Sequence, residues 1–113
     1  MLLSYPIADG TGIRVEVPRI DAAAAIAFKD RMKALTDEGG GRVVLDLSQV
    51  SFVDSSGLGA IVAAMKQLPP DRRLELAGLL PAVQRVFHLT RMDTVFRIHA
   101  DAEAAGAALQ RAS

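Results

Sequence analysis

The chain has 113 residues, of which half are hydrophobic and 23% are charged, and its 13 basic side chains are balanced by 13 acidic ones. This length and composition predict one globular domain, and the formal net charge of zero argues against a nucleic-acid or anionic-membrane partner. The chain has no cysteine, which excludes disulfides, thiol catalysis and cysteine metal sites. The two histidines, His88 and His99, lack the spacing of a metal motif, so we expect neither a metal nor a cofactor.

The N-terminal segment lacks a basic stretch followed by a sustained apolar run. No segment approaches the roughly 20 apolar residues that a membrane-spanning helix needs. We therefore expect no membrane insertion and a cytoplasmic location. No internal repeat or low-complexity linker divides the chain.

The first half of the chain predicts a hairpin, a helix and a buried strand. Residues 2–7 and the strictly alternating residues 13–17 are predicted as two strands joined by a glycine-containing turn. Asp21 is placed to cap a helix that runs to about Asp37, where three glycines end it. Residues 43–47 form a nearly continuous apolar run, which is typical of a strand buried on both faces. We place this strand in the centre of the sheet.

The second half continues the alternation of helices and strands. Apolar residues at intervals of three and four predict a helix over residues 56–68. Three further elements follow: a strand at 74–76, a helix that begins at Pro81, and a strand at 95–98. Asp101 is placed to cap a last helix that ends near Gln110. We expect a single α/β domain whose mixed β-sheet opens with a hairpin and is packed with about four helices.

The segment 51–59, Ser-Phe-Val-Asp-Ser-Ser-Gly-Leu-Gly, places two hydroxyls beside a carboxylate at the predicted start of the second helix. A helix start has unpaired backbone N–H groups and a partial positive charge, which favour a capping oxygen or a phosphate. The simplest interpretation is that Asp54 or Ser55 is an N-cap. A cap does not explain Gly57 and Gly59, because glycine weakens a helix. We interpret Gly57 as a point of close approach for another molecule and Gly59 as a contact between helix and sheet.

Two other interpretations of this segment fail on its residues. The nucleophile elbow of serine hydrolases needs a glycine two residues before the serine, but valine and aspartate stand there before Ser55 and Ser56. A phosphate-binding P-loop needs a Gly-Lys-Ser or Gly-Lys-Thr sequence, and none follows the glycines. We therefore expect no catalytic residue and no enzyme activity.

Three segments along the chain form one pattern: the apolar strand 43–47, the segment 50–59, and the stretch 80–90 with Leu-Pro-Ala-Val-Gln-Arg-Val-Phe. In order and spacing they resemble the STAS-domain proteins of the bacterial anti-sigma factor antagonist family. The pattern runs along nearly the whole chain. The resemblance therefore implies one STAS domain over residues 1–113.

In that family, the serine directly after the aspartate is phosphorylated by a partner that is both an anti-sigma factor and an ATP-dependent serine kinase. This serine corresponds to Ser55, which the family pattern favours over Ser56. The resemblance implies that the unmodified loop binds this partner and releases its client, a sigma factor or another protein. Phosphate beside Asp54 would oppose binding, and a serine phosphatase would reset the switch. The implied binding site comprises Asp54, Ser55, Ser56, Gly57, Leu58 and Gly59.

The same resemblance assigns the chain to signal transduction and the regulation of transcription, without direct contact to nucleic acid. Some loops depart from the family pattern. Pro18 stands at a strand-to-helix corner where relatives commonly carry glycine, Arg91 replaces another frequent glycine, and Pro69-Pro70 replaces a glycine-rich turn. These loops border the expected docking face, so they bear on which partner is bound.

Two other functions of the same fold stay open. One is an accessory subunit of an ABC-type lipid transporter, whose relatives tend to carry threonine near the position of Ser55. The other is a nucleotide-binding domain, although the serine loop lacks a lysine or an extended glycine run to hold phosphates.

Several conspicuous residues outside the loop have structural interpretations. We expect Arg72 and Arg73 on a solvated edge before a strand, and His88 at an exposed position of the third helix. Met65 and Met92 could soften a binding surface, but helical spacing favours core packing for Met65.

Overall fold

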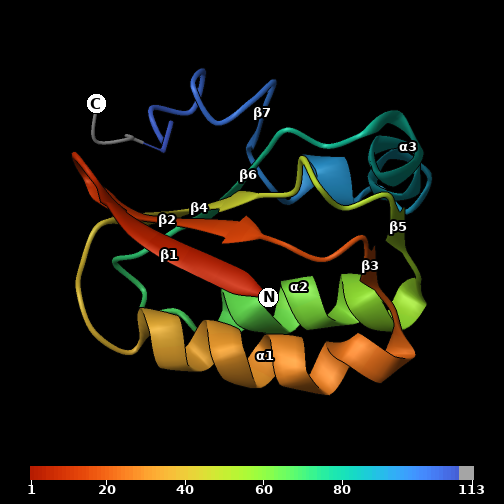
Figure 1. The fold of residues 1–113 in the computed structure, drawn as a ribbon, viewed down its shortest axis with the longest axis horizontal. Helices are drawn as coiled ribbons and strands as arrows, with labels where there is room; N and C mark the ends of the chain where they lie inside the picture. Colours follow the sequence, from red (N-terminus) through yellow and green to blue (C-terminus); the bar gives the residue numbers. More distant parts are fainter. Residues whose placement is uncertain (110–113) are drawn as a thin grey trace.

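The computed structural model describes residues 1–109, which form a mixed β-sheet with the helices over residues 22–36 and 55–67 on one face (Figure 1). This confirms the predicted α/β class, with three α-helices and one short 3₁₀ helix among the described residues where about four helices are expected. No helix within residues 1–109 is long and apolar enough to cross a membrane. The elements in chain order are β1 (Leu2–Ile7), β2 (Gly10–Val15), β3 (Arg19–Ile20), α1 (Ala22–Thr36), β4 (Arg42–Asp46), β5 (Phe52–Val53), α2 (Ser55–Gln67), β6 (Leu74–Ala77), α3 (Pro81–Leu89), η1 (Met92–Thr94) and β7 (Ile98–His99).

The main sheet has the strand order β1-β2-β4-β6-β7. β1 and β2 pair antiparallel, as the predicted hairpin requires, and the other neighbouring strands pair in parallel. β4 lies in the middle, and its residues Val43, Val44 and Leu45 are all fully buried. Both faces of β4 therefore lie in apolar surroundings, which confirms the prediction from its uninterrupted apolar run.

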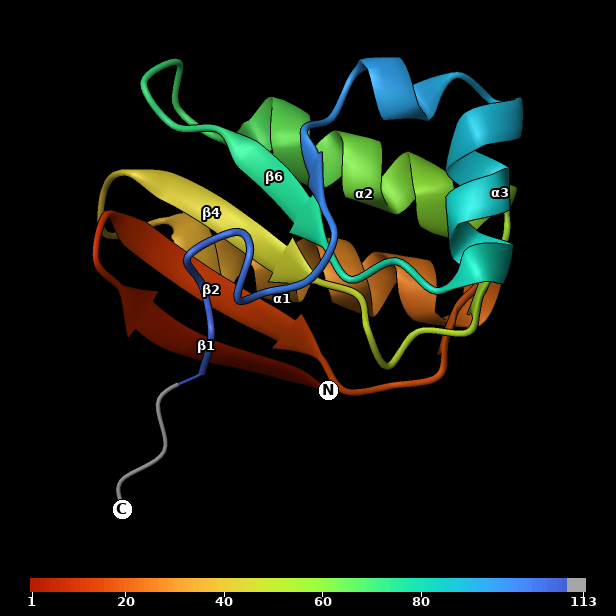
Figure 2. The same cartoon turned by 90° about the horizontal axis from the view of Figure 1, so that it is seen from above.

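The main core lies between the sheet and the helices α1 and α2, which pack side by side on one face (Figures 1 and 2). Phe28 and Met32 of α1 and Ile61 of α2 are nearly or fully buried. α3 closes one end of this layer with Phe87, whose ring meets that of Phe96 edge-on at a centroid distance of 5.9 Å. The helical spacing of these residues predicts the inward faces correctly.

The opposite face of the sheet is covered by the C-terminal segment, which crosses it as a series of turns (Figure 2). The predicted helix from Asp101 is therefore wrong as far as residue 109, and Gln110 lies outside the described residues. Asp101 does cap a turn, because its carboxylate accepts a hydrogen bond from the backbone N–H of Ala104 at 2.7 Å. Gly106 then adopts a left-handed backbone conformation with φ 71°, which a helix does not allow.

Contacts with the sheet explain why this segment is not helical. Apart from its terminal Leu109, the segment offers only alanine side chains to an apolar neighbour. The Tyr5 hydroxyl of β1 donates to the carbonyl of Ala107 at 2.7 Å, and the guanidinium of Arg42 in β4 donates to the carbonyl of Ala105. These contacts hold both carbonyls toward the sheet, so tertiary contacts override local helix propensity.

The last strand is shorter than the sequence predicts. Val95 and Phe96 belong to the end of the 3₁₀ turn, since their N–H groups donate to the Met92 carbonyl at 3.0 and 3.2 Å. β7 begins only at Ile98. The apolar pattern over 95–98 reflects the burial of Phe96 in the core.

Arg72 contradicts the expectation of a solvated side chain. It is 5% exposed, and its guanidinium donates to the carbonyls of Gly41 at 2.7 Å and of Thr36 and Gly40, each at 3.1 Å. Thr36 ends α1, so Arg72 satisfies a carbonyl that the helix end leaves without a helical partner. Arg73 is exposed, as expected.

Candidate functional site

The serine segment lies where β5 passes into α2. β5 pairs in parallel with β3, which leads into α1, so the entries of the two helices lie side by side. Asp54 is the N-cap of α2: its Oδ1 accepts the Gly57 N–H at 2.8 Å, and its Oδ2 accepts the Ala22 N–H of α1 at 3.2 Å. One carboxylate therefore ties the first turns of both helices together. Of the two predicted candidates for the cap, Asp54 holds this place and Ser55 does not.

Ser55 and Ser56 are the first two residues of α2, and both are exposed. Because the cap uses the carboxylate, the helix start does not consume either hydroxyl. The two serines differ in what lies next to them, since Ser55 lines a groove and Ser56 does not. The structure thus distinguishes two residues that only the family pattern separates in the sequence.

The groove beside Ser55 is open, mostly apolar, and about 560 Å³ in volume. Leu58 and Val62 of α2 form one wall, and the opposite wall comes from α3 and the start of η1. The groove is lined by Val53, Asp54, Ser55, Leu58, Gly59, Val62, Val86, Thr90 and Met92.

The sequence predicts only one wall of this groove. Asp54, Ser55, Leu58 and Gly59 line it as members of the predicted loop and helix start, whereas Ser56 and Gly57 do not. The opposite wall, residues 86–92, is absent from the predicted site. It arises because α3 and η1 lie across the groove from α2, an arrangement that depends on the tertiary structure. The only signals of this wall in the sequence are Met92 and the turn at Arg91, which borders the expected docking face.

The two glycines of α2 have the opposite roles from those predicted. A Cβ on Gly57 would lie 1.9 Å from the carbonyl oxygen of Ile20, so Gly57 allows α2 to pack against the strand that leads into α1. A Cβ on Gly59 would meet nothing within 4 Å, and Gly59 faces the open groove. Gly57 therefore serves packing within the chain, and Gly59 lies where a ligand has access.

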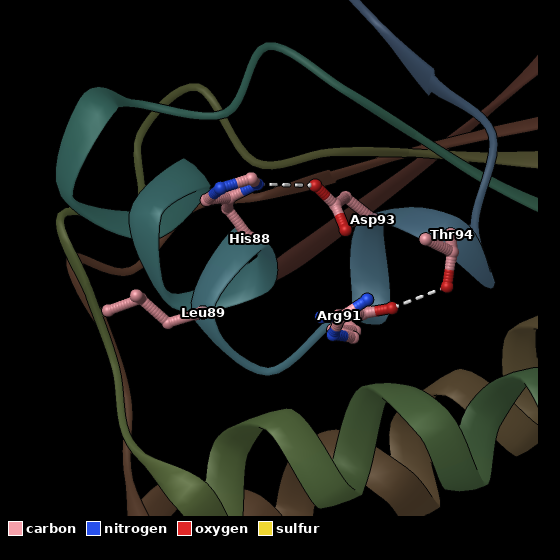
Figure 3. A pocket seen from close by; sticks show the side chains of 5 residues that line it. All are labelled: His88, Leu89, Arg91, Asp93 and Thr94. Atoms are coloured by element: carbon pink, nitrogen blue, oxygen red, sulfur yellow. Dashed lines mark hydrogen bonds and ion pairs between the residues drawn. The ribbon is translucent and has the colours of Figure 1, made fainter.

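The turn between α3 and η1 forms the outer rim of the groove, to which it contributes Thr90 and Met92. The other residues of this turn line a second, separate hollow (Figure 3). Leu89 is 73% exposed and points away from α3. Arg91 has a left-handed backbone conformation, with φ 59° and ψ 18°. Such a conformation costs about 1–2 kcal/mol for a residue that carries a Cβ. This rim combines an exposed apolar side chain with an exposed cation.

The histidines lie away from Ser55. His88 is exposed, as predicted, and its Nδ1 lies 3.0 Å from a carboxylate oxygen of Asp93 (Figure 3). His99 lies 2.8 Å from Glu75 on the sheet. Neither histidine lines the groove, so the groove supplies no imidazole base to activate a serine hydroxyl.

Glu75 is the centre of a polar cluster on the sheet face that carries the C-terminal segment. Its Oε1 lies 2.9 Å from an Arg42 nitrogen and 2.8 Å from His99 Nε2. Burial alone would raise the pKa of the Glu75 carboxyl, but the hydrogen bonds from His99 and Arg42 outweigh it and lower the pKa. This cluster links β4, β6 and β7, and Arg42 extends it to the C-terminal segment.

The model of the STAS domain family matches residues 7–105 of the chain. BtrV of Bordetella bronchiseptica, described as a candidate anti-sigma factor antagonist, is 32% identical over 113 residues, which cover 99% of this chain and 97% of BtrV. A solved anti-sigma factor antagonist from Mycobacterium paratuberculosis has a TM-score of 0.83 and 26% identity over 93% of this chain and 89% of its own.

A third similar protein is the Bacillus cell fate determinant SpoIIAA, solved in its phosphorylated form. It has a TM-score of 0.65 and 20% identity, and the match covers 93% of this chain and 96% of SpoIIAA. At this identity the likeness shows a shared fold. The match to the family model and the 32% identity to BtrV show the family: the chain belongs to the STAS-domain family of anti-sigma factor antagonists.

Proposed function

We propose that the protein is a phosphorylation-switched anti-sigma factor antagonist. With Ser55 unmodified, the helix start and the adjacent groove bind an anti-sigma factor that is also a serine kinase, and this partner then releases its client. The observation that carries the proposal is the position of Ser55, an exposed hydroxyl at the start of α2 that also lines an apolar groove. Such a position is accessible to a kinase and adjacent to a surface on which a protein can dock.

Phosphorylation of Ser55 would act on this surface through charge and hydration. The phosphate adds about −1.5 to −2 charges next to Asp54, whose carboxylate is fixed by two backbone N–H groups. An apolar partner surface would then have to displace water from the phosphate, so binding is opposed. The start of α2 favours the added negative charge, which limits the change to the local surface and leaves the fold intact.

Membership in the anti-sigma factor antagonist family supports the partner class. The phosphorylated form of SpoIIAA, a protein with the same fold, supports a switch of this kind. We propose that a serine phosphatase removes the phosphate and that the cycle operates in the cytoplasm. In this role the protein is a kinase substrate and a binding module without catalysis of its own.

Phosphosite mapping tests the proposal directly. The wild type and the matched variants Ser55→Ala and Ser56→Ala are incubated with ATP and each purified anti-sigma factor kinase of the source organism. We expect the wild type and Ser56→Ala to gain one phosphate on Ser55, and Ser55→Ala to gain none. Phosphate that maps to Ser56, or that persists in Ser55→Ala, contradicts the assignment.

A further inference from the structure

Arg91 has an unusual backbone conformation for an arginine. Among residues 1–109 it is the one residue other than glycine with a positive φ. The left-handed region disfavours side chains with a Cβ, so glycine or asparagine is the ordinary choice at such a turn. Arginine in this position lowers the stability of the fold unless its side chain gains a contact.

Contacts within the described residues do not compensate for this strain. The side chain is exposed, and the guanidinium of Arg91 makes no ion pair among residues 1–109. The turn is held by the Arg91 carbonyl, which accepts the Thr94 N–H at 3.2 Å and the Thr94 hydroxyl at 2.6 Å (Figure 3). A glycine would offer the same carbonyl. The turn therefore has no need of the arginine side chain.

Arg91 lies between two residues of the groove wall. Its neighbours in sequence, Thr90 and Met92, both line the groove. The carboxylates nearby have other hydrogen-bond partners, since Asp93 lies 3.0 Å from the His88 ring nitrogen and Asp54 caps α2. The rim thus presents a cation without a counterion beside an apolar hollow. A protein surface with apolar side chains and one adjacent carboxylate complements both features.

We propose that Arg91 is a specificity-determining residue that pairs with an aspartate or glutamate of the partner anti-sigma factor. The partner's apolar side chains occupy the groove beside Ser55, and its carboxylate meets the guanidinium at the rim. The inference rests on the proposed function, because it names the chemistry of the surface that the same partner presents. A charge pair at an interface rim acts mainly on the association rate and makes binding sensitive to salt.

The test measures binding of the unphosphorylated protein to the purified kinases named above, for the wild type and for Arg91→Gly, Arg91→Lys and Arg91→Glu. Arg91→Gly should raise Tm by about 4–8 °C, because it relieves the backbone strain. The same variant should bind about 10-fold more weakly and with less salt dependence. Arg91→Lys should stay within about threefold of the wild type, and Arg91→Glu should bind more weakly than Arg91→Gly.

Arg31→Glu is the matched control. Arg31 is exposed on α1 and does not line the groove, so this variant carries the same charge change as Arg91→Glu at a different site. We expect it to bind like the wild type. A purely structural role for Arg91 would move stability and binding in the same direction, whereas the proposal predicts opposite directions for Arg91→Gly.

The outcomes separate this inference from the proposed function. If the wild type binds a kinase, and Arg91→Gly and Arg91→Glu both bind this kinase with the affinity of the wild type, the role of Arg91 is refuted and the proposed function stands. If Arg91→Gly binds normally but no longer loses affinity when Ser55 is phosphorylated, Arg91 holds the phosphate and the partner carboxylate is refuted. A wild-type protein that binds none of the kinases overturns both.

Discussion

Gly57 and Gly59 show how one residue type serves two purposes within a single helical turn. Gly57 is buried against the carbonyl of Ile20, whereas Gly59 is exposed in the groove. Both weaken α2 through their backbone freedom. Only Gly57 is required by the packing of the chain, so the absence of a side chain at Gly59 leaves room for a bound partner.

The two glycines form a matched pair for a stability measurement. Gly57→Ala should lower the free energy of unfolding by about 2–3 kcal/mol, because the new methyl group overlaps the Ile20 carbonyl. Gly59→Ala should raise it by about 0.5–1 kcal/mol, because alanine favours the helix and meets no neighbour. Urea unfolding of both variants measures the difference. Similar free energies for the two would contradict the packing assigned to Gly57.

At the scale of elements, α1 depends on a residue far along the chain. Arg72 lies in the connection between α2 and β6, yet its guanidinium binds the last carbonyl of α1 and the glycine turn that follows it. Buried guanidinium groups with several carbonyl acceptors are costly to leave unmatched. The end of α1 is therefore fixed by the loop before β6.

Replacement of this arginine should destabilise the protein strongly. Arg72→Met removes the donors from at least three carbonyls and should lower the free energy of unfolding by about 2–4 kcal/mol. Arg73→Met changes an exposed neighbour in the same way and should alter it by about 0.5 kcal/mol or less. Denaturant unfolding of the two variants measures both values. Equal effects would show that the Arg72 contacts do not hold α1.

Sequence patterns predict the elements whose signals are local. Asp21 and Asp54 cap their helices where the sequence places them, and the apolar run of β4 marks the middle of the sheet. The errors occur where distant residues decide. The segment after Asp101 follows the sheet, Arg72 reaches back to α1, and the far wall of the groove exists only because α3 and η1 lie across it from α2.

At the scale of the whole molecule, the two faces of the sheet carry different features. The helical face ends in the groove and the serine loop, while the other face carries the Glu75 cluster. The C-terminal segment crosses this second face (Figure 2). Ser55, the site of the proposed switch, and the polar cluster belong to separate parts of the structure. We therefore expect changes in the cluster to alter stability and to leave partner binding at neutral pH intact.

Acid should test the cluster. The pKa of the Glu75 carboxyl in the folded protein is lowered from its ordinary value of 4.5. The ionised carboxylate therefore stabilises the fold at pH values above 4.5, and this stabilisation is lost as the pH falls through the pKa of the folded protein. Glu75→Gln should lower the free energy of unfolding at pH 7 and should flatten its decline below pH 4.5. Glu103→Gln, at an exposed site, is the control. An unchanged pH dependence in Glu75→Gln would contradict the role of the cluster.

The affinity of the cognate anti-sigma factor kinase for the unmodified and the Ser55-phosphorylated protein tests the switch most directly. Calorimetry with ADP in place of ATP prevents phosphorylation during the titration. We predict that the unmodified protein and Ser55→Ala bind within about twofold of each other, and that the phosphorylated protein and Ser55→Asp bind at least about 10-fold more weakly. Equal affinity of the unmodified and phosphorylated forms would contradict the switch.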